Sequence, residues 1–318
     1  MTNPKAAALS PFQIVSLLSI FLLAIFPHPI LSTKSSEGFE FLKNLEGCHK
    51  GQTVKGLREL KLYLKKFGYA ANVVNHTEYE HSDQFDDILE EEIKTYQLNY
   101  HLKATGNLDA ETVKQMTAPR CGFPDIVNGK TPMRSGNKKE SSLHTVSHFT
   151  FFRGNPRWPR SKSHLTYRFS STIPVTSNII NTLRAVCSSA FARWAEVSHF
   201  TFSEAVHQAD IVIGFHRGSH GDGHSFDGRG GVLAHAFAPV DGRFHYDADE
   251  KWSTHPAQGS GTYDLESVAL HEIGHLLGLG HSTERDAVMF SSIQPGSLKR
   301  QLYANDIRGV RTLYGLRP

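Results

Sequence analysis

The apolar residues between Phe39 and Met116 have the spacing of amphipathic helices. One set recurs at steps of three and four residues, as the buried face of a helix does: Val54, Leu57, Leu60 and Leu64. A second set indicates another helix: Ile88, Ile93, Tyr96, Leu98 and Leu102. Gly106 interrupts this second segment, and Asp109 is placed to cap a third, short helix that runs to Met116. The pattern predicts a small domain of three helices.

From residue 165 onward, buried strands alternate with helices. Strands are predicted over residues 165–169 and 209–215, and helices over residues 177–197, 265–277 and 304–313. We expect Thr262 or Asp264 to cap the second of these helices, and the cap of the third to lie near Asn305. This order predicts a separate α+β domain with one sheet and few helices.

Residues 1–32 have the pattern of a cleaved secretory signal peptide. Lys5 precedes an apolar stretch over residues 14–26, which ends before Pro27. A membrane anchor is the alternative, but the stretch is shorter than the roughly 20 residues that span a bilayer. Residues 306–318 are charged and show no apolar tail of a transmembrane or GPI anchor. We expect a secreted protein without a transmembrane segment.

The composition is that of a globular protein and narrows the function. Of the 318 residues, 39% are hydrophobic and 20% are charged, which fits two domains that each bury a core. The net charge is only +3 and the basic residues are dispersed, so we expect no nucleic-acid partner. Cys48, Cys121 and Cys187 are too few for a disulfide framework and leave at least one thiol to explain.

Two polar segments interrupt the predicted domains. Residues 126–148 are polar and basic, and we expect them to form a linker that an activating protease cuts. Asn75, in the sequence Asn-His-Thr, is a glycosylation site if the protein is exported.

Histidines in the last third of the chain indicate a metal site. Several of the 19 histidines lie among aspartates and glycines between residues 220 and 281. In the helix predicted over residues 265–277, His271 and His275 are four residues apart, so both imidazoles leave the same face and can share one ion. Glu272 is rotated about 100° from His271, where it can act as a general base without ligating the metal.

Two glycines allow the chain to bring a third histidine to the same ion. Gly278 and Gly280 accept positive φ, so the chain can leave the helix after His275 and return His281 toward the metal. Three imidazoles with one open position describe a catalytic zinc site, whereas structural zinc usually has four protein ligands. A chance His-Glu-x-x-His pattern on an ordinary helix is the alternative, and the glycines at the bend argue against it.

The segment from His271 to His281, with Met289 eight residues later, resembles the metzincin metalloproteases and their Met-turn. By itself, Met289 would more simply be a core residue. The resemblance implies that Glu272 takes a proton from the attacking water and returns it to the leaving amine during peptide hydrolysis.

Residues 119–125, Pro-Arg-Cys-Gly-Phe-Pro-Asp, resemble the cysteine-switch motif of matrix metalloproteinase propeptides. Phe123 stands where that motif more usually has Asn or Val. The resemblance implies that the Cys121 thiolate occupies the fourth zinc position and keeps a proenzyme inactive. A buried structural thiol is the alternative for Cys121.

Residues 47–51, Gly-Cys-His-Lys-Gly, look like the propeptides of plant matrix metalloproteinases, and we find no hemopexin-like segment in the sequence. The resemblance therefore covers nearly the whole chain. It implies a signal peptide, a helical propeptide similar to peptidoglycan-binding domains, a linker and a catalytic domain, over residues 1–32, 33–125, 126–148 and 149–318. The implied catalytic domain has a twisted, mostly parallel sheet with three helices. The implied location is extracellular, in the apoplast or cell wall of a plant, with extracellular proteins or peptides as substrates.

The resemblance also implies further metal sites. A structural zinc would take three imidazoles and one carboxylate: His220, Asp222, His235 and His245. A calcium ion would take oxygen ligands from a glycine-rich loop and the residues after a strand: Asp227, Gly228, Gly230, Asp247 and Glu250. At a second calcium site of the family, Arg243 replaces a carboxylate, although Asp210 and Asp241 could contribute.

Residues 233–237 alternate as an edge strand does, and the resemblance implies that an extended substrate adds to it antiparallel. Residues 291–293, Ser-Ser-Ile, replace a Pro-x-Tyr sequence of many animal relatives in the wall of a hydrophobic specificity pocket. Two alternatives stay open. A carbohydrate-binding or peptidoglycan-binding protein with an inactive metal scaffold would not need Glu272. A zinc hydrolase of non-peptide substrates would not need an edge strand or a propeptide thiol.

Overall fold

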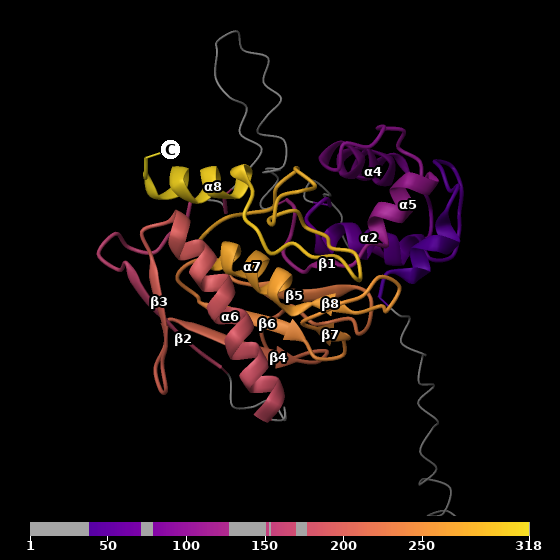
Figure 1. Ribbon diagram of the computed structural model, residues 1–318. Helices are drawn as coiled ribbons and strands as arrows, with labels where there is room; N and C mark the ends of the chain where they lie inside the picture. The colour runs from indigo at the N-terminus through magenta and orange to yellow at the C-terminus, as the bar shows by residue number, and fades with distance from the viewer. Residues whose placement is uncertain (1–37, 71–78, 127–150, 153, 170–176, 318) are drawn as a thin grey trace, which may run out of the picture. The chain divides into compact units, whose positions relative to one another are not determined.

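The computed structural model describes residues 38–70, 79–126, 151–152, 154–169 and 177–317 (Figure 1). The predicted signal peptide, the sequon at Asn75 and residues 127–148 of the predicted linker lie outside these residues. No helix in the described part is long and apolar enough to cross a membrane.

The N-terminal region, which we define as the described residues up to 126, contains the three predicted helices. They are α2 (Leu57–Lys66), α4 (Asp87–Asn99) and α5 (Ala110–Met116), preceded by a short 3-10 helix, η1 (Glu40–Leu45). The sequence pattern did not predict η1. Asp109 caps α5 as expected, because its carboxylate accepts the N–H of Thr112 at 2.9 Å.

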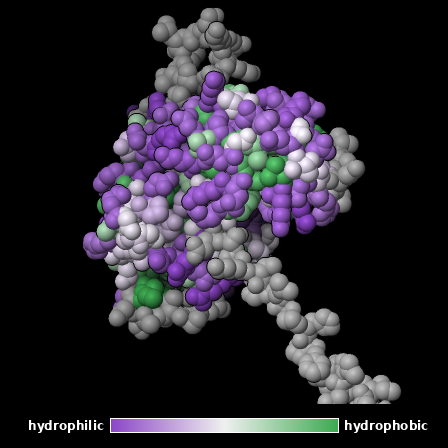
Figure 2. Space-filling model, turned by 90° about the vertical axis from the view of Figure 1, so that its right-hand side faces the viewer, coloured by the Kyte–Doolittle hydropathy of each residue, from purple (hydrophilic) through white to green (hydrophobic). Residues whose placement is uncertain are grey.

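The core of this region confirms most of the predicted apolar positions. The fully buried ones are Leu57, Leu60, Leu64, Ile93 and Tyr96. The prediction was wrong for Ile88 and Leu98, which are 44% and 46% exposed. Ile88 precedes Ile93 by five residues and Leu98 follows Tyr96 by two, so α4 turns them about 140° and 200° away from the buried face. Figure 2 shows that the side of the molecule that carries the N-terminal helices is mostly hydrophilic, with a small hydrophobic area.

A sheet organises the C-terminal region, which comprises the described residues from 151 onward. Its strands are β1 (Arg120–Cys121), β2 (His164–Phe169), β3 (Thr201–Glu204), β4 (Ile211–His216), β5 (Val232–Ala236) and β6 (Arg243–Asp247). The six strands follow the order β1-β5-β6-β4-β2-β3, in which only β5 and β6 pair antiparallel. A mostly parallel sheet is confirmed, and β1 comes from the N-terminal region. A smaller sheet pairs β7 (Trp252–Ser253) with β8 (Tyr263–Asp264).

The three predicted helices of this region are α6 (Ser177–Val197), α7 (Leu265–Leu276) and α8 (Ala304–Tyr314). Helix α6 packs along α7, α7 contacts β5 and β6, and α8 contacts α6 (Figure 1). Of the two candidate caps of α7, Asp264 is the one used, since its carboxylate accepts the Ser267 N–H at 2.9 Å. The cap of α8 was expected near Asn305, and the group that caps it is the neighbouring Asp306. Its carboxylate accepts the Tyr303 N–H at 2.9 Å.

Two hydrophobic clusters form the cores of these regions. One lies under α6 and α7 and includes Trp194, which is fully buried. The other holds the N-terminal helices and also includes Val232 and Phe290 of the C-terminal region. The N-terminal region therefore shares part of its core with the surface that it covers, and burial of this apolar area stabilises the contact.

Candidate metal centre and active site

Helix α7 positions two histidines on one buried face, as the spacing predicts. His271 and His275 are 7% and 0% exposed. The Nδ1–H of His271 donates to the carbonyl of Val288 at 2.7 Å, and that of His275 donates to the carbonyl of Leu279 at 2.7 Å. Because Nδ1 carries the proton in each ring, both Nε2 atoms present lone pairs to the site.

A bend after α7 brings in the third histidine. Gly278 has a φ of +99°, and a Cβ at this position would lie 2.5 Å from the carbonyl oxygen of Pro156. Gly278 thus confirms the predicted role of glycine at the bend, whereas Gly280 does not have a positive φ. His281 follows the bend and is 1% exposed.

The predicted Met-turn lies directly beneath α7. A Cβ added to Gly274, between the two histidines of the helix, would lie 2.2 Å from the Met289 sulfur. Asp306 on α8 holds this turn in place, because its carboxylate accepts the N–H groups of Val288 and Met289 at 3.0 and 3.1 Å. Asp306 was not predicted from the sequence, although it is an acidic residue in the first turn of the helix that follows the motif.

Four side chains converge at this point: Cys121, His271, His275 and His281, whose ligand atoms all lie within 4.8 Å of one another. The Nε2 atoms of His271 and His275 are 3.1 Å apart, and the Cys121 sulfur is 3.4 Å from the His275 Nε2. Ligand atoms of one tetrahedral zinc ion are about 3.3–3.8 Å apart, so this set fits such an ion. Two lone-pair nitrogens at this distance repel unless a cation lies between them.

The electrostatics of the four groups also fit a cation. Burial lowers the pKa of His271 to about 3, which keeps its ring neutral. Burial, and then the charge of Glu272, raise the pKa of the Cys121 thiol well above its usual value. A thiolate at this position therefore requires a positive charge beside it.

Glu272 lies next to the histidines but is placed differently from them. It is 1% exposed, and neither carboxylate oxygen accepts a hydrogen bond of normal geometry from the part of the chain that the structure describes. Burial raises its pKa to about 8. A buried carboxylate with raised proton affinity beside a metal site is suited to accept a proton from water.

Residues around Cys121 lie as an extended peptide between two segments of the C-terminal region. On one side, the N–H groups of Arg120 and Gly122 donate to the carbonyls of Gly231 and Ala234 at 3.0 and 2.8 Å, which makes β1 run parallel to β5. On the other side, the N–H of Cys121 donates to the Ser291 carbonyl at 2.8 Å. The predicted edge strand is therefore real, and in this structure a segment of the chain itself pairs with it.

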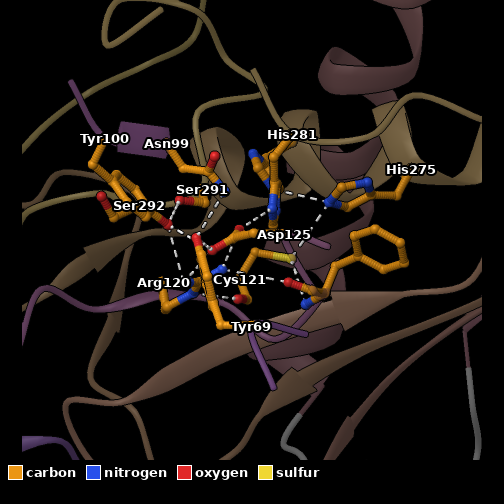
Figure 3. Close-up of polar contacts among 12 residues, drawn as sticks. Tyr69, Asn99, Tyr100, Arg120, Cys121, Asp125, His275, His281, Ser291 and Ser292 are labelled. Carbon is orange, nitrogen blue, oxygen red and sulfur yellow. Dashed lines mark hydrogen bonds and ion pairs between the residues drawn. The ribbon is translucent and has the colours of Figure 1, made fainter. Parts of the chain in front are cut away.

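A buried ion pair fixes this segment (Figure 3). Arg120 and Asp125 are 2% and 0% exposed, and two nitrogens of the guanidinium donate to the two carboxylate oxygens at 2.6 and 3.0 Å. Asp125 also accepts the Nδ1–H of His281 at 2.9 Å. Burial alone would raise the pKa of Asp125, but the charge of Arg120 and the hydrogen bond from His281 hold it well below its usual range.

Tyrosines of the N-terminal region extend this network. The hydroxyls of Tyr69 and Tyr100 donate to Asp125 at 2.8 and 3.0 Å, and the Tyr100 hydroxyl is 2.8 Å from the Ser291 hydroxyl. Asp125 belongs to the motif over residues 119–125, but no contact of its side chain was predicted. Neither tyrosine was predicted to take part, because nothing in their local sequence distinguishes them from ordinary core residues.

The second predicted zinc cluster also comes together. Oδ2 of Asp222 lies 2.8, 2.7 and 2.9 Å from ring nitrogens of His220, His235 and His245. A single carboxylate oxygen has too few lone pairs to accept three such hydrogen bonds, so the set fits a shared cation better. Burial lowers the pKa values of His235 and His245 to about 3 and about 4, which favours neutral ligands.

The predicted calcium residues lie near one another but less closely. In the described part of the chain, only the two histidine clusters bring the ligand atoms of three or more His, Cys, Asp or Glu side chains within 4.8 Å of one another. Gly228 and Gly230 both have a φ of +82° and form the predicted loop, in which the Gly230 N–H donates to Glu250 at 2.6 Å. Burial, and then neighbouring carboxylates, raise the pKa values of Asp247 and Glu250 to about 7.

Three cations already lie beside acidic residues of the predicted calcium sites. Lys66 of α2 is 3.9 Å from Oδ2 of Asp227, which the loop contributes. Arg243 forms a two-pronged ion pair with Asp241, at 2.6 and 2.8 Å. Asp210 is paired with Lys162.

Three buried imidazoles, an adjacent buried carboxylate and an edge strand that binds extended peptide are the arrangement of a metallopeptidase. Comparisons with known proteins agree. The model of the Matrixin family matches residues 157–315, and a model described as a putative peptidoglycan binding domain matches residues 53–116.

The chain is similar over most of its length to plant metalloendoproteinases. It is 41% identical to Metalloendoproteinase 2-MMP of Arabidopsis thaliana over a match that covers 96% of this chain and 86% of that protein. It is 43% identical to Metalloendoproteinase 1 of Glycine max over 276 residues, which cover 85% of each. Interstitial collagenase of Sus scrofa is 40% identical over 71% of this chain and 43% of that protein. This chain belongs to the matrixin family and is a zinc-dependent endopeptidase.

Proposed function

We propose that this chain is a secreted proenzyme whose residues 33–125 act as a propeptide and block the active site through Cys121. The observation that carries this proposal is the position of the Cys121 sulfur, 3.4 Å from the His275 Nε2 in a cluster of four possible ligands. The backbone of β1 supports it, because it occupies the cleft between β5 and residues 291–293. Export is supported by the signal-peptide pattern of residues 1–32.

In the active enzyme, His271, His275 and His281 hold the catalytic zinc, and Glu272 is the general base. Zinc bound there supplies Lewis-acid chemistry toward the peptide carbonyl. Glu272 takes the proton of the attacking water and returns it to the nitrogen of the leaving amine. The edge of β5, once β1 has left it, binds the substrate backbone antiparallel, so that peptides of varied sequence fit.

The remaining assignments form part of the same proposal. His220, Asp222, His235 and His245 hold a structural zinc, and the loop with Asp227, Gly228, Gly230, Asp247 and Glu250 holds calcium. An activating protease cuts residues 126–148, Asn75 carries a glycan, and the substrates are extracellular proteins, in the apoplast or cell wall if the source is a plant.

The test is cleavage of a quenched peptide by the purified full chain, with and without a mercurial that binds Cys121, and with a zinc chelator as a control. We expect activity only with the mercurial, and its loss with the chelator. Cys121→Ser should be active without mercurial. Cys48→Ser, which removes another buried thiol of the N-terminal region, should still require it. No cleavage under any condition, with zinc shown to be bound, would favour the binding-scaffold alternative.

A further inference from the structure

A pocket that is open to solvent lies beside the proposed general base. Glu272 and His271 line it on the side of the metal cluster, and Val268 and Phe290 contribute apolar walls. Such a pocket next to the reacting groups receives a side chain of the substrate adjacent to the cleaved bond. Its lining therefore contributes to the choice of cleavage site.

The pocket also contains a cation, Lys299, which the apolar lining does not explain. The backbone N–H of Lys299 donates to the hydroxyl of Ser267 at 2.7 Å. Ser267 precedes His271 by four residues on α7, which corresponds to about 6 Å along the helix. The backbone of Lys299 thus lies beside α7 about one helical turn before His271, at the end of the pocket away from the metal cluster.

One N–H group of the Lys299 ammonium is available to a substrate. Its Nζ donates to the carbonyls of Arg285 and Ala287 at 2.5 and 3.0 Å. An ammonium group has three N–H donors, so these two bonds leave one donor within the described part of the chain. The ring of Phe290, which also lines the pocket, lies 5.1 Å from Nζ, so the ammonium lies beside the pocket wall.

We propose that Lys299 makes this pocket select substrate side chains with a long apolar stem and a hydrogen-bond-accepting tip, with glutamine as the best fit. The inference rests on the proposed function and adds a substrate preference to it. An apolar tip such as that of norleucine displaces water from the Lys299 donor without replacing its hydrogen bond, which costs binding in the transition state. A glutamine side chain supplies the acceptor without the cost of desolvating a second full charge.

The test uses the full chain activated by mercurial and pairs of quenched peptides that differ at one position. Glutamine is compared with norleucine, first in the residue after the cleaved bond and then in the residue before it. The wild type should cleave the glutamine peptide at least as fast as the norleucine peptide, at one of the two positions only. In Lys299→Met, the ratio of kcat/KM for glutamine over norleucine should fall about tenfold at that position, as for loss of one hydrogen bond from a charged donor.

The ratio separates selectivity from general damage, because Lys299 also holds the segment that leads to Val288. Lys299→Arg, which keeps a charged donor, should retain most of the ratio, and Lys251→Met, at an exposed lysine, should not change it. An equal loss for both peptides in Lys299→Met would overturn the inference and leave Lys299 a structural role. If Lys299→Met does not fold, a wild type that prefers norleucine at both positions overturns it as well. A wild type that cleaves no peptide contradicts the proposed function itself.

Discussion

The two histidine clusters have the same number of ligands but differ in where these come from. His220, Asp222, His235 and His245 lie within one stretch of the C-terminal region, on β5, β6 and the loop before them. The other cluster takes three histidines from α7 and the bend after it, and its fourth member, Cys121, from the N-terminal region. The first cluster can lose a ligand only by unfolding locally, whereas in the proposed proenzyme the second loses Cys121 when the N-terminal region leaves.

The two clusters also differ in the role of the carboxylate that lies beside their histidines. Oδ2 of Asp222 lies among the three histidines, and its Oδ1 accepts the backbone N–H of His224 at 2.8 Å. Glu272 lies beside its cluster, buried and outside the set of ligand atoms that converge there. An open position and a spare carboxylate distinguish a site that can do chemistry from one that can only stabilise. The following predictions test this distinction.

The largest effect is expected from Glu272→Gln. The amide cannot accept a proton from water, so kcat/KM of the mercurial-treated protein should fall by about 10²–10⁴-fold. The zinc content, measured by elemental analysis, should not change, because the three histidines remain. Activity within a few-fold of wild type would remove Glu272 as the base and weaken the contrast between the two clusters.

Asp222→Ala is the matched change in the other cluster and should have the opposite signature. One zinc per chain should be lost, and the free energy of unfolding should fall by about 3–5 kcal/mol, because three buried imidazoles lose their shared partner. The protein that stays folded should retain measurable peptide cleavage. Unchanged metal content with lost activity would show that this cluster is not a structural site.

The three imidazoles beside Glu272 could be predicted from the residues because short-range geometry places them, whereas Cys121 and the four residues of the other cluster were expected only from the resemblance to matrix metalloproteinases. The spacing of His271 and His275 on a helix and the glycine at position 278 are enough to bring three imidazoles together. The helices and two of the strands could be predicted for the same reason, since each has a local period of apolar residues, whereas the parallel order of the sheet was implied by the resemblance. Errors arose where the period was imperfect, as for Ile88 and Leu98.

The contacts that support the site could not be predicted in this way. Asp306 holds the Met-turn across 17 residues, and Asp125 reaches His281 across 156 residues. Neither pairing leaves a periodic signal in a single sequence, because each depends on how whole elements pack. The chain's pairing with its own edge strand is of this kind too, since β1 is only two residues long.

A smaller effect is expected from Asp125→Asn, which weakens the link between the N-terminal region and the third histidine. The amide still accepts hydrogen bonds from the tyrosines, but Arg120 loses its opposite charge in a buried site. We expect a cost of about 2–3 kcal/mol to the closed state, the size of hydrogen bonds between charged groups. The proenzyme should then show activity without mercurial. Asp109→Asn, which keeps the cap of α5 far from this network, is the control and should stay latent.

The smallest effect is expected from Tyr100→Phe, which leaves the charges in place. Its hydroxyl accepts from Arg120 at 3.0 Å, donates to Asp125 at 3.0 Å and lies 2.8 Å from Ser291 of the C-terminal region. Loss of these bonds should weaken closure by about 1 kcal/mol and raise the activity without mercurial about fivefold.

Tyr79→Phe is the matched control for this change, because the Tyr79 hydroxyl donates at 2.6 Å to Glu92 within the N-terminal region. If latency depends on contacts across the cleft, Tyr79→Phe lowers the stability of the helices without raising the activity, whereas Tyr100→Phe raises the activity. Equal effects of the two changes would mean that the fourth position opens through unfolding of the N-terminal helices. The two histidine clusters would then differ only in the stability of the region that supplies the last ligand.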